Sequence, residues 1–300
     1  MIRSVFDEKR KKRVRFWIYE LVFCGVILVM FILMKILPFL MSIGYSFTNW
    51  NGVSDDIHFI LFDNFKRLAK DTAFWNSLEF TVKFCLASIV LVNVIGFALA
   101  YLLTRRVRFR NVLRAGFYLP NVMGGLVLGF IWQFVFLKIV PAIGQATGLS
   151  LFNLLWLATP ATAFWGLVIV QVWNASGYYM LLYIAGFTSI PMDCVESAHI
   201  DGASSWQMLC KVIIPLMMPT VTRCAFLSII ASFKIYTLNY ALTDGGPYQS
   251  SESIAMDIYR TAFTQNSMGY GSAKALVFTL LVVAVTSLQL WFTSRKEVEM

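Results

Sequence analysis

The sequence predicts an all-α polytopic membrane protein with six transmembrane helices, and three observations support this fold class. The 300-residue chain is 58% hydrophobic, against about 45–50% for soluble domains. Only 14% of its residues are charged, against about 25% in soluble domains. Its basic residues gather at the ends of long apolar runs, which is the pattern that the positive-inside rule gives to membrane helices.

The first part of the chain alternates between polar segments and apolar runs. A basic run at 9–15 closes the tail at 1–15, and we expect this tail in the cytoplasm because an apolar run follows at once. That run, at 16–47, is long enough to cross a hydrocarbon core of about 30 Å. It is too long for the apolar part of a cleaved signal peptide. Residues 48–73 are polar and are expected outside, before a second span at 74–103.

The middle of the chain repeats this alternation. A second basic run at 105–110 is expected inside, and a third span is expected at 115–138. Residues 139–158 then form an outer connection to the fourth span at 160–188. The polar segment 191–219 follows, and we expect it inside.

Two further spans complete the predicted topology. The fifth is expected at 220–242, and the outer loop 243–270 leads to the sixth at 271–293. Both termini are therefore expected in the cytoplasm. Because no internal repeat or low-complexity linker is visible, residues 16–300 are expected to form a single transmembrane domain, with a core at about 74–294.

The sequence offers no sign of enzyme chemistry. The five cysteines have neither metal nor disulfide spacing, and no ligand role is expected for His58 or His199. No cluster of nucleophile, base or metal ligands is visible, so we expect no catalytic residue, metal or cofactor. The net charge of +9 comes from the basic ends of the spans, so no nucleic acid partner is expected.

The polar segment between the fourth and fifth spans has helical features. Asp193, followed three residues later by Glu196, predicts the start of a helix with Asp193 as its cap. Val195, Ala198 and Gly202 recur at helical spacing and give a face of small and apolar residues. Gly202 is expected to end this helix or to allow another backbone to approach closely.

A second short helix is expected after this glycine, with Trp206, Leu209 and Cys210 as its apolar stripe. Such a helical segment either lies in the lipid interface or docks on a soluble partner. The residues by themselves leave both alternatives open.

The spacing within this segment carries a family resemblance. Glu196-Ser197-Ala198 is followed after three residues by Gly202 and, nine residues later, by Val212-Ile213-Ile214-Pro215. This pattern resembles the EAA loop of permease subunits of binding-protein-dependent ABC importers, which reads E-A-A, three residues, G, nine residues, I-x-L-P. Ser197, Val212 and Ile214 depart from it but are similar in size to the expected residues. We refer to residues 191–219 as the EAA loop.

Further segments resemble the carbohydrate-uptake branch of these permeases. They lie at 119–132, 200–220, 232–247 and 251–263. With the EAA loop they extend the resemblance over most of the chain from about residue 60 to 290. They do not indicate a particular sugar.

The resemblance implies a type I ABC importer permease fold, a bacterial cell membrane location and an ATP-driven mechanism. The EAA loop would dock into a groove on an ATPase subunit through the following residues: Glu196, Ser197, Ala198, Asp201, Gly202 and Pro215. The implied partners are a second permease in a heterodimer, two ATP-binding subunits, an extracellular sugar-binding protein and the sugar. Because the chain has no P-loop sequence, it is expected not to be an enzyme itself.

Polar side chains inside the predicted spans are candidates for the substrate pathway, because such groups are unfavourable in lipid. The candidates are Asn174, Tyr178, Ser232, Tyr236 and Asn239. The last three are expected on one helical face, and Tyr178 matches a family position associated with the central sugar site. The alternative is that these groups form hydrogen bonds between helices.

Two other transport functions compete with sugar import. The first is an ABC importer for another solute, such as glycerol phosphate or an amino acid; a phosphate group would favour fixed arginines in the pathway. The second is a secondary transporter, which would show paired repeats with broken helices and would not need the EAA spacing.

Overall fold

The computed structural model describes residue 19 and residues 23–105, 107–149, 152 and 154–295. These residues form helices, turns and loops, with one isolated bridge between Thr48 and Phe59 and no β-strand among them. The predicted all-α fold class is thereby confirmed. The described residues divide into two compact units, one within 1–69 and 261–276 and the other within 70–260 and 277–300.

Five described helices are long and apolar enough to cross a membrane. They are Phe23–Tyr45, Thr72–Thr104, Gly125–Thr147, Pro160–Thr188 and Met268–Ser294. The pair Ser205–Leu216 and Met218–Phe233 is also long and apolar enough when taken together, but it is bent by 70°. The predicted second, fourth and sixth spans therefore agree with the structure to within a few residues.

The first unit holds the first membrane helix and a folded polar segment. The helix contains a π-helical turn, η1 (Ile32–Ile36), and α2 (Leu37–Tyr45). The short helix α3 (Asp63–Ala69) is bonded to the segment that follows α2. Asn64 Nδ2 donates to the carbonyl oxygens of Ser46 at 2.9 Å and Thr48 at 2.8 Å. The polar segment predicted at 48–73 thus has internal structure.

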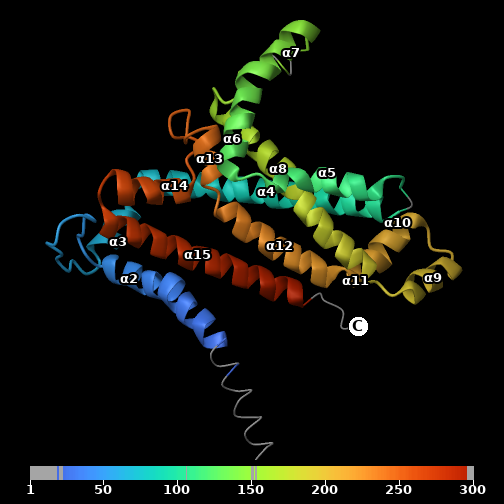
Figure 1. Cartoon of the computed structure of the whole chain (residues 1–300), viewed down its shortest axis with the longest axis horizontal. Coiled ribbons are helices and arrows are strands. Elements are labelled where there is room, and N and C mark those ends of the chain that lie inside the picture. The colour runs from blue at the N-terminus through green and yellow to red at the C-terminus, as the bar shows by residue number, and fades with distance from the viewer. Residues whose placement is uncertain (1–18, 20–22, 106, 150–151, 153, 296–300) are drawn as a thin grey trace, which may run out of the picture. The chain divides into compact units, whose positions relative to one another are not determined.

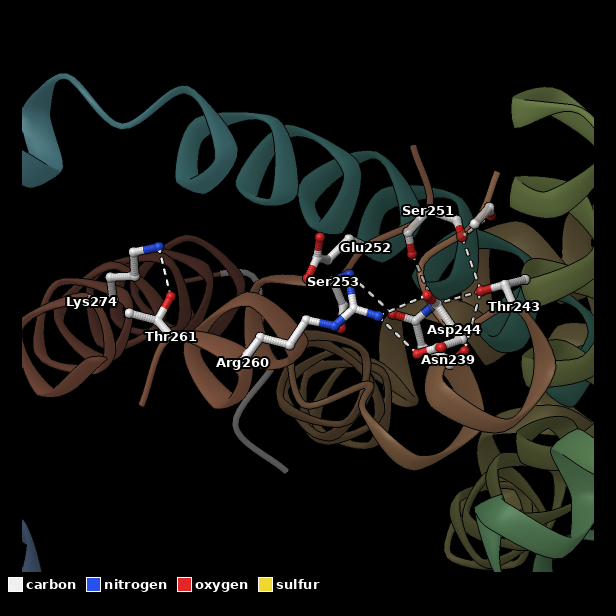
Figure 2. A network of polar contacts seen from close by, with 10 residues as sticks. Asn239, Thr243, Asp244, Ser251, Glu252, Ser253, Arg260, Thr261 and Lys274 are labelled. Carbon is white, nitrogen blue, oxygen red and sulfur yellow. Dashed lines mark hydrogen bonds and ion pairs between the residues drawn. The ribbon is translucent and has the colours of Figure 1, made fainter. Parts of the chain in front are cut away.

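The same unit includes the start of the last helix, α15 (Met268–Ser294). The Arg67 guanidinium lies 4.0 Å from the centre of the Tyr270 ring, a cation–π contact. Lys274 is buried, and its Nζ donates to Thr261 Oγ1 at 3.0 Å (Figure 2). The side chains of this unit thereby connect α3, α15 and π-helical turn η5 (Arg260–Thr264).

The centre of the second unit is the pair α4 (Thr72–Thr104) and α8 (Pro160–Thr188). Asp71 begins α4 by accepting hydrogen bonds from two backbone amides of the first turn, and Thr159 begins α8 in a capping box. The two helices pack closely at Gly96, where an added Cβ would lie 3.0 Å from Tyr179 Cβ. Small residues permit such close helix contact in membranes.

The third span differs from the prediction. Helix α5 (Arg110–Val122) packs against α8 and ends at Met123, which is extended. A new helix then runs through α6 (Gly125–Phe134), η2 (Val135–Ile139) and α7 (Val140–Thr147). Within this unit it turns away from α4, α5 and α8 (Figure 1). The expected span at 115–138 is wrong, because the chain breaks at Met123–Gly124, and the expected outer connection at 139–158 begins as a helix.

The fifth span is also shorter than expected. Helix α12 (Met218–Phe233) packs on α4, where Asn93 Nδ2 donates to Ser228 Oγ at 3.0 Å. Tyr183 of α8 donates its hydroxyl to Asn93 Oδ1 at 2.8 Å, so one asparagine links three helices. The helix ends at Phe233, and α13 (Thr237–Leu242) follows separately. A continuous helix at 220–242 is therefore wrong.

Candidate functional site

The EAA loop forms two short helical segments joined by a turn. The first is α9 (Met192–Ile200). The second consists of α10 (Ser205–Gln207), the π-helical turn η4 (Met208–Ile213) and α11 (Ile214–Leu216). Pro215 lies in α11, just before the bend into α12. A proline at this point is consistent with a helix that stops and restarts in a new direction.

Gly202 makes the turn between the two helical segments. Its φ of +76° lies in the left-handed region, which side chains with a Cβ rarely adopt. The Gly202 N–H donates to the His199 carbonyl at 3.1 Å, and the Ala203 N–H donates to Ala198 at 3.0 Å. The prediction that Gly202 ends the first helix is confirmed. A Cβ at this position would meet no atom within 4 Å, so the space beside it is open.

The helix-start prediction was wrong in its details. The N-cap of α9 is Pro191, which has no side-chain cap hydrogen bond, and Asp193 lies within the first turn. A carboxylate there still favours the helix through its dipole. The capping box lies instead at Ser204, whose side chain and backbone exchange hydrogen bonds with Gln207 at 3.3 and 2.8 Å. The polar side chains of the loop thus stiffen the turn after Gly202.

Two large apolar side chains flank the turn and point into solvent. Ile200 is 86% exposed and Trp206 is 71% exposed. The expected apolar stripe of Trp206, Leu209 and Cys210 is therefore wrong for Trp206, because its ring does not pack within the chain. Exposed large apolar groups in a polar loop are typical of a protein interaction site.

The acidic residues of the loop add charge to the same surface. Glu196, Ser197 and Asp201 are exposed, and Ala198 is half-buried. Neither Glu196 nor Asp201 takes part in an ion pair within the described part of the chain. The loop therefore presents unpaired carboxylates beside Ile200 and Trp206.

Two of the predicted pathway residues lie together on α8. Asn174 and Tyr178 are one turn apart, and both are half-buried. Asn121 of α5 donates from Nδ2 to Asn174 Oδ1 at 3.3 Å. The Tyr178 ring packs edge-on against Tyr179, with 5.3 Å between the ring centres. Asn174 thus has an interhelical partner, and Tyr178 keeps part of its surface open.

The other three predicted pathway residues do not share a helical face. Ser232 is buried near the end of α12, and Tyr236 lies in the break before α13, with φ −134° and ψ −64°. Asn239 belongs to α13. The expected i, i+4, i+7 alignment is wrong because the helix stops at Phe233.

Asn239 holds the following loop in place, as Figure 2 shows. Its side chain is fully buried. Nδ2 donates to Thr243 Oγ1 at 2.9 Å and to the Ser251 carbonyl at 2.8 Å, while Oδ1 accepts from the Ser253 N–H at 3.0 Å. Both Nδ2 hydrogens and the Oδ1 atom are therefore used within the chain.

An ion triad that the sequence reasoning missed lies in the same network. Arg260 Nη1 lies 3.0 Å from Glu252 Oε1, and Nη2 lies 2.8 Å from Asp244 Oδ1 (Figure 2). Glu252 is 5% exposed. One guanidinium thus faces two carboxylates, which leaves the triad with a formal charge of −1. The only available signal was that Asp244, Glu252 and Asp257 precede Arg260 in the same predicted outer loop.

Three tyrosines gather beside this triad. The Tyr236 ring lies 6.2 Å from that of Tyr240, nearly parallel to it, and 5.3 Å from that of Tyr259. Tyr240 is 47% exposed and Tyr259 is 46% exposed. Exposed aromatic rings with hydroxyl groups suit a ligand that has both apolar C–H faces and hydroxyls. Sequence reasoning identified Tyr236 alone and missed Tyr240, four residues later; Tyr259 comes from a separate helix, α14 (Ile254–Tyr259).

The fifth span also carries an arginine, Arg223, near the beginning of α12. It lines a cavity of about 260 Å³ with Thr220, Ser189 and other residues of α8 and α12. This cavity lies at the EAA-loop end of both helices, because Ser189 ends α8 and Thr220 lies in the first turn of α12. Arg223 is therefore remote along α12 from the tyrosines beyond Phe233.

The fold and motif agree with known proteins. Residues 92–298 match the model of the family described as binding-protein-dependent transport system inner membrane component. A chain from a bacterial ABC transporter that imports the acidic polysaccharide alginate has a similar fold, with a TM-score of 0.81 at 19% identity, covering 95% of this chain and 98% of that one.

Two relatives are similar along most of their length. One is a probable starch degradation products transport system permease protein, AmyD, of Thermoanaerobacterium thermosulfurigenes, 42% identical over 97% of this chain and 99% of the relative. Another is the multiple sugar-binding transport system permease protein MsmF of Streptococcus mutans, 32% identical over 87% of this chain and 90% of the relative. The chain therefore belongs to the family of inner membrane components of binding-protein-dependent transport systems.

Proposed function

We propose that this chain is the membrane subunit through which an ATP-driven importer moves a neutral sugar or oligosaccharide. It pairs with a second permease, docks two ATP-binding subunits and receives the sugar from an extracellular binding protein. Residues 16–300 act as one membrane domain in a bacterial cell membrane, and the tail at 1–15 is cytoplasmic. The observation that carries the proposal is the turn at Gly202, with its exposed apolar and acidic side chains.

The EAA loop has the features of a docking element. Ile200 and Trp206 offer apolar surface, while Glu196 and Asp201 offer charge for basic groups on an ATPase. The bend of 70° after Pro215 connects this element to α12. Movement of the loop with an ATPase would therefore be transmitted directly to a membrane-spanning helix.

The charge near the helix break favours a neutral substrate. The guanidinium of Arg260 is already paired with Asp244 and Glu252, so it offers little attraction to a phosphate or carboxylate group. The neighbouring tyrosines supply the stacking surfaces and hydroxyl groups that a sugar requires. The names of the relatives AmyD and MsmF also refer to starch degradation products and to sugars.

Reconstitution tests this function against secondary transport. The four-subunit complex is placed in liposomes with the binding protein outside and ATP inside, and labelled sugar uptake is measured. Uptake should require ATP hydrolysis and the binding protein. Uptake driven by a proton or sodium gradient in the absence of ATP would contradict the proposal, and preferential uptake of glycerol phosphate would contradict the substrate class.

Cysteine labelling tests the topology. In a cysteine-free background, Arg108→Cys and Gln207→Cys should be protected from a membrane-impermeant thiol reagent in intact cells, whereas Asp56→Cys should be labelled. All three native residues are exposed, so protection from the reagent would come from the membrane barrier and not from burial within the chain. Permeabilised cells serve as the control, since all three positions should then react. Labelling of Gln207→Cys from outside would place the EAA loop on the wrong side.

Tyr178→Ala should weaken sugar uptake without uncoupling the ATPase. Loss of one hydrogen bond or stacking contact should raise the sugar concentration for half-maximal uptake by about tenfold at most. Uptake is measured against sugar concentration, together with ATPase activity stimulated by the loaded binding protein. Tyr19→Ala, which changes an exposed tyrosine that precedes the first membrane helix in the sequence, is the control and should leave uptake unchanged. An unchanged half-maximal concentration in Tyr178→Ala would remove this residue from the pathway.

A further inference from the structure

An apolar groove runs along the second unit between α4, α5 and α8. It has a volume of about 560 Å³, within the range of about 300–1,000 Å³ that is usual for ligand sites. Its walls include Leu91, Ile95 and Leu99 of α4, Gly116 and Phe117 of α5, and Trp165, Ile169, Trp173 and Ser176 of α8. Trp165 is 49% exposed and Trp173 is 43% exposed, so the chain itself does not cover the groove.

The groove lies at the depth of lipid acyl chains. At about 1.5 Å per residue, Leu99 lies about 7 Å and Leu91 about 20 Å from the end of α4 at Thr104. One leaflet of hydrocarbon is about 15 Å thick, half of the full core. With Thr104 placed at the membrane surface, next to the basic run at 105–110, the α4 wall extends from just inside this surface to beyond the bilayer midplane.

The groove also faces away from the proposed substrate pathway. At about 100° per residue, Ile169 and Ser176 lie within about 40° of Trp165 around α8. Asn174 and Tyr178 lie about 180° and 220° from Trp165. The groove and these two residues therefore lie on different sides of α8.

A cluster of arginines stands at one end of the groove. Arg105, Arg108 and Arg110 are exposed in the connection from α4 to α5. Arg114 Nη2 donates to the carbonyl of Leu103 at 3.3 Å, one turn beyond the groove residue Leu99. The Arg114 guanidinium therefore lies at the membrane end of the groove.

The charge of this arginine cluster is not balanced nearby in the sequence. No Asp or Glu occurs between residues 80 and 192. In the part of the chain that the structure describes, none of the ion pairs includes Arg105, Arg108, Arg110 or Arg114. Basic clusters at the membrane surface attract anionic lipid headgroups.

We propose that this groove and the arginine cluster together bind an anionic phospholipid. The phosphate is held by Arg105, Arg110 and Arg114, and one acyl chain lies against Leu99, Ile95 and Trp173. The exposed side chains of Phe109 and Val112 enter the same leaflet beside the headgroup. The site is separate from the sugar pathway and does not depend on the identity of the substrate.

Tryptophan quenching tests this site in the purified complex with its partner subunits. Phosphatidylglycerol brominated near the ends of its acyl chains is titrated into the complex in mild detergent, and brominated phosphatidylcholine is the comparison. The fluorescence that comes from Trp173 in the groove is the difference between the fluorescence of the wild type and that of Trp173→Phe. Brominated phosphatidylglycerol should quench this signal at lower concentrations than brominated phosphatidylcholine.

Variants separate the headgroup and acyl-chain parts of the site. Each arginine near an anionic surface contributes about fivefold in affinity, so Arg110→Gln with Arg114→Gln should weaken phosphatidylglycerol binding about 25-fold. Arg295→Gln is the matched control, because Arg295 stacks on Trp291 at 3.8 Å at the end of another helix. Gly116→Leu should prevent quenching by both lipids, since a Cβ there meets no atom within 4 Å and the side chain fills the groove.

Three outcomes would overturn the proposal. Equal quenching by the two brominated lipids would remove the headgroup preference. If Arg295→Gln weakened phosphatidylglycerol binding as much as Arg110→Gln with Arg114→Gln does, the binding would depend on basic charge at the membrane surface and not on this arginine cluster. A Trp173 signal that neither lipid quenches, with crosslinking of Ile169→Cys to the second permease, would show that a protein helix occupies the groove.

Discussion

Gly202→Trp is expected to abolish transport while the complex still receives sugar from its binding protein. The native φ of +76° is unfavourable for any residue with a Cβ, at about 1–3 kcal/mol for such a strained position. The indole would also occupy the open space beside the turn, between Ile200 and Trp206, where an ATPase is proposed to dock. ATP-driven uptake in proteoliposomes and the ATPase activity stimulated by the loaded binding protein should both fall to background.

Gly148→Trp is the matched control for this variant. Gly148 also has a positive φ, +71°, and a Cβ added there would likewise meet nothing within 4 Å. It ends α7 and lies outside the EAA loop. Both variants therefore impose similar backbone strain, and only Gly202→Trp obstructs the docking surface. Equal transport by the two variants would show that this turn does not contact the ATPase.

Asn239→Ala is expected to destabilise the protein and not to weaken sugar binding directly. The substitution leaves the Ser253 N–H and the Ser251 carbonyl without their buried partner, while the Thr243 hydroxyl keeps its hydrogen bonds to Ser251 Oγ and to the residue 239 carbonyl. Each buried group that loses its partner costs about 1–3 kcal/mol. The melting temperature and the yield of assembled complex should fall. In the complex that does assemble, the sugar concentration for half-maximal uptake should stay within about twofold of the wild type, since no stacking contact or substrate hydrogen bond is removed.

Asn76→Ala provides the comparison, because Asn76 is an exposed asparagine on α4. Its melting temperature should stay close to that of the wild type. One other combination of results would give Asn239 a role in substrate binding. If Asn239→Ala melts normally but requires far more sugar for half-maximal uptake, its side chain is a substrate ligand.

Much of the helical layout could be predicted from hydropathy. The fourth span begins at Pro160 and ends at Thr188, as expected from its run of apolar residues. Gly202 was identified because it follows the helical face of Val195 and Ala198, and because glycine readily adopts the left-handed backbone conformation that ends a helix. These features depend on neighbouring residues, so the local sequence contains the information.

The features that sequence reasoning missed depend on distant contacts or on breaks between two helices. Mean hydropathy is low over Arg110–Val122 and high over Gly125–Phe134, so the expected span at 115–138 joined the end of one helix to the beginning of the next. Asn239 is satisfied by a loop whose fold places Ser251 and Ser253 against it. The tyrosines at 236, 240 and 259 meet only because α13 and α14 (Ile254–Tyr259) pack near the break.

The early end of α12 places a helix terminus and a cation side by side. The carboxyl end of a helix carries about half a negative charge. Lys234 directly follows Phe233 and its side chain is exposed, so its ammonium group offsets that charge. The carbonyls of Ile230 and Ser232 also accept hydrogen bonds from the Lys234 and Ile235 amides. A substrate that passes this break would therefore meet opposite charges held close together, an arrangement that suits a neutral molecule with many hydroxyl groups.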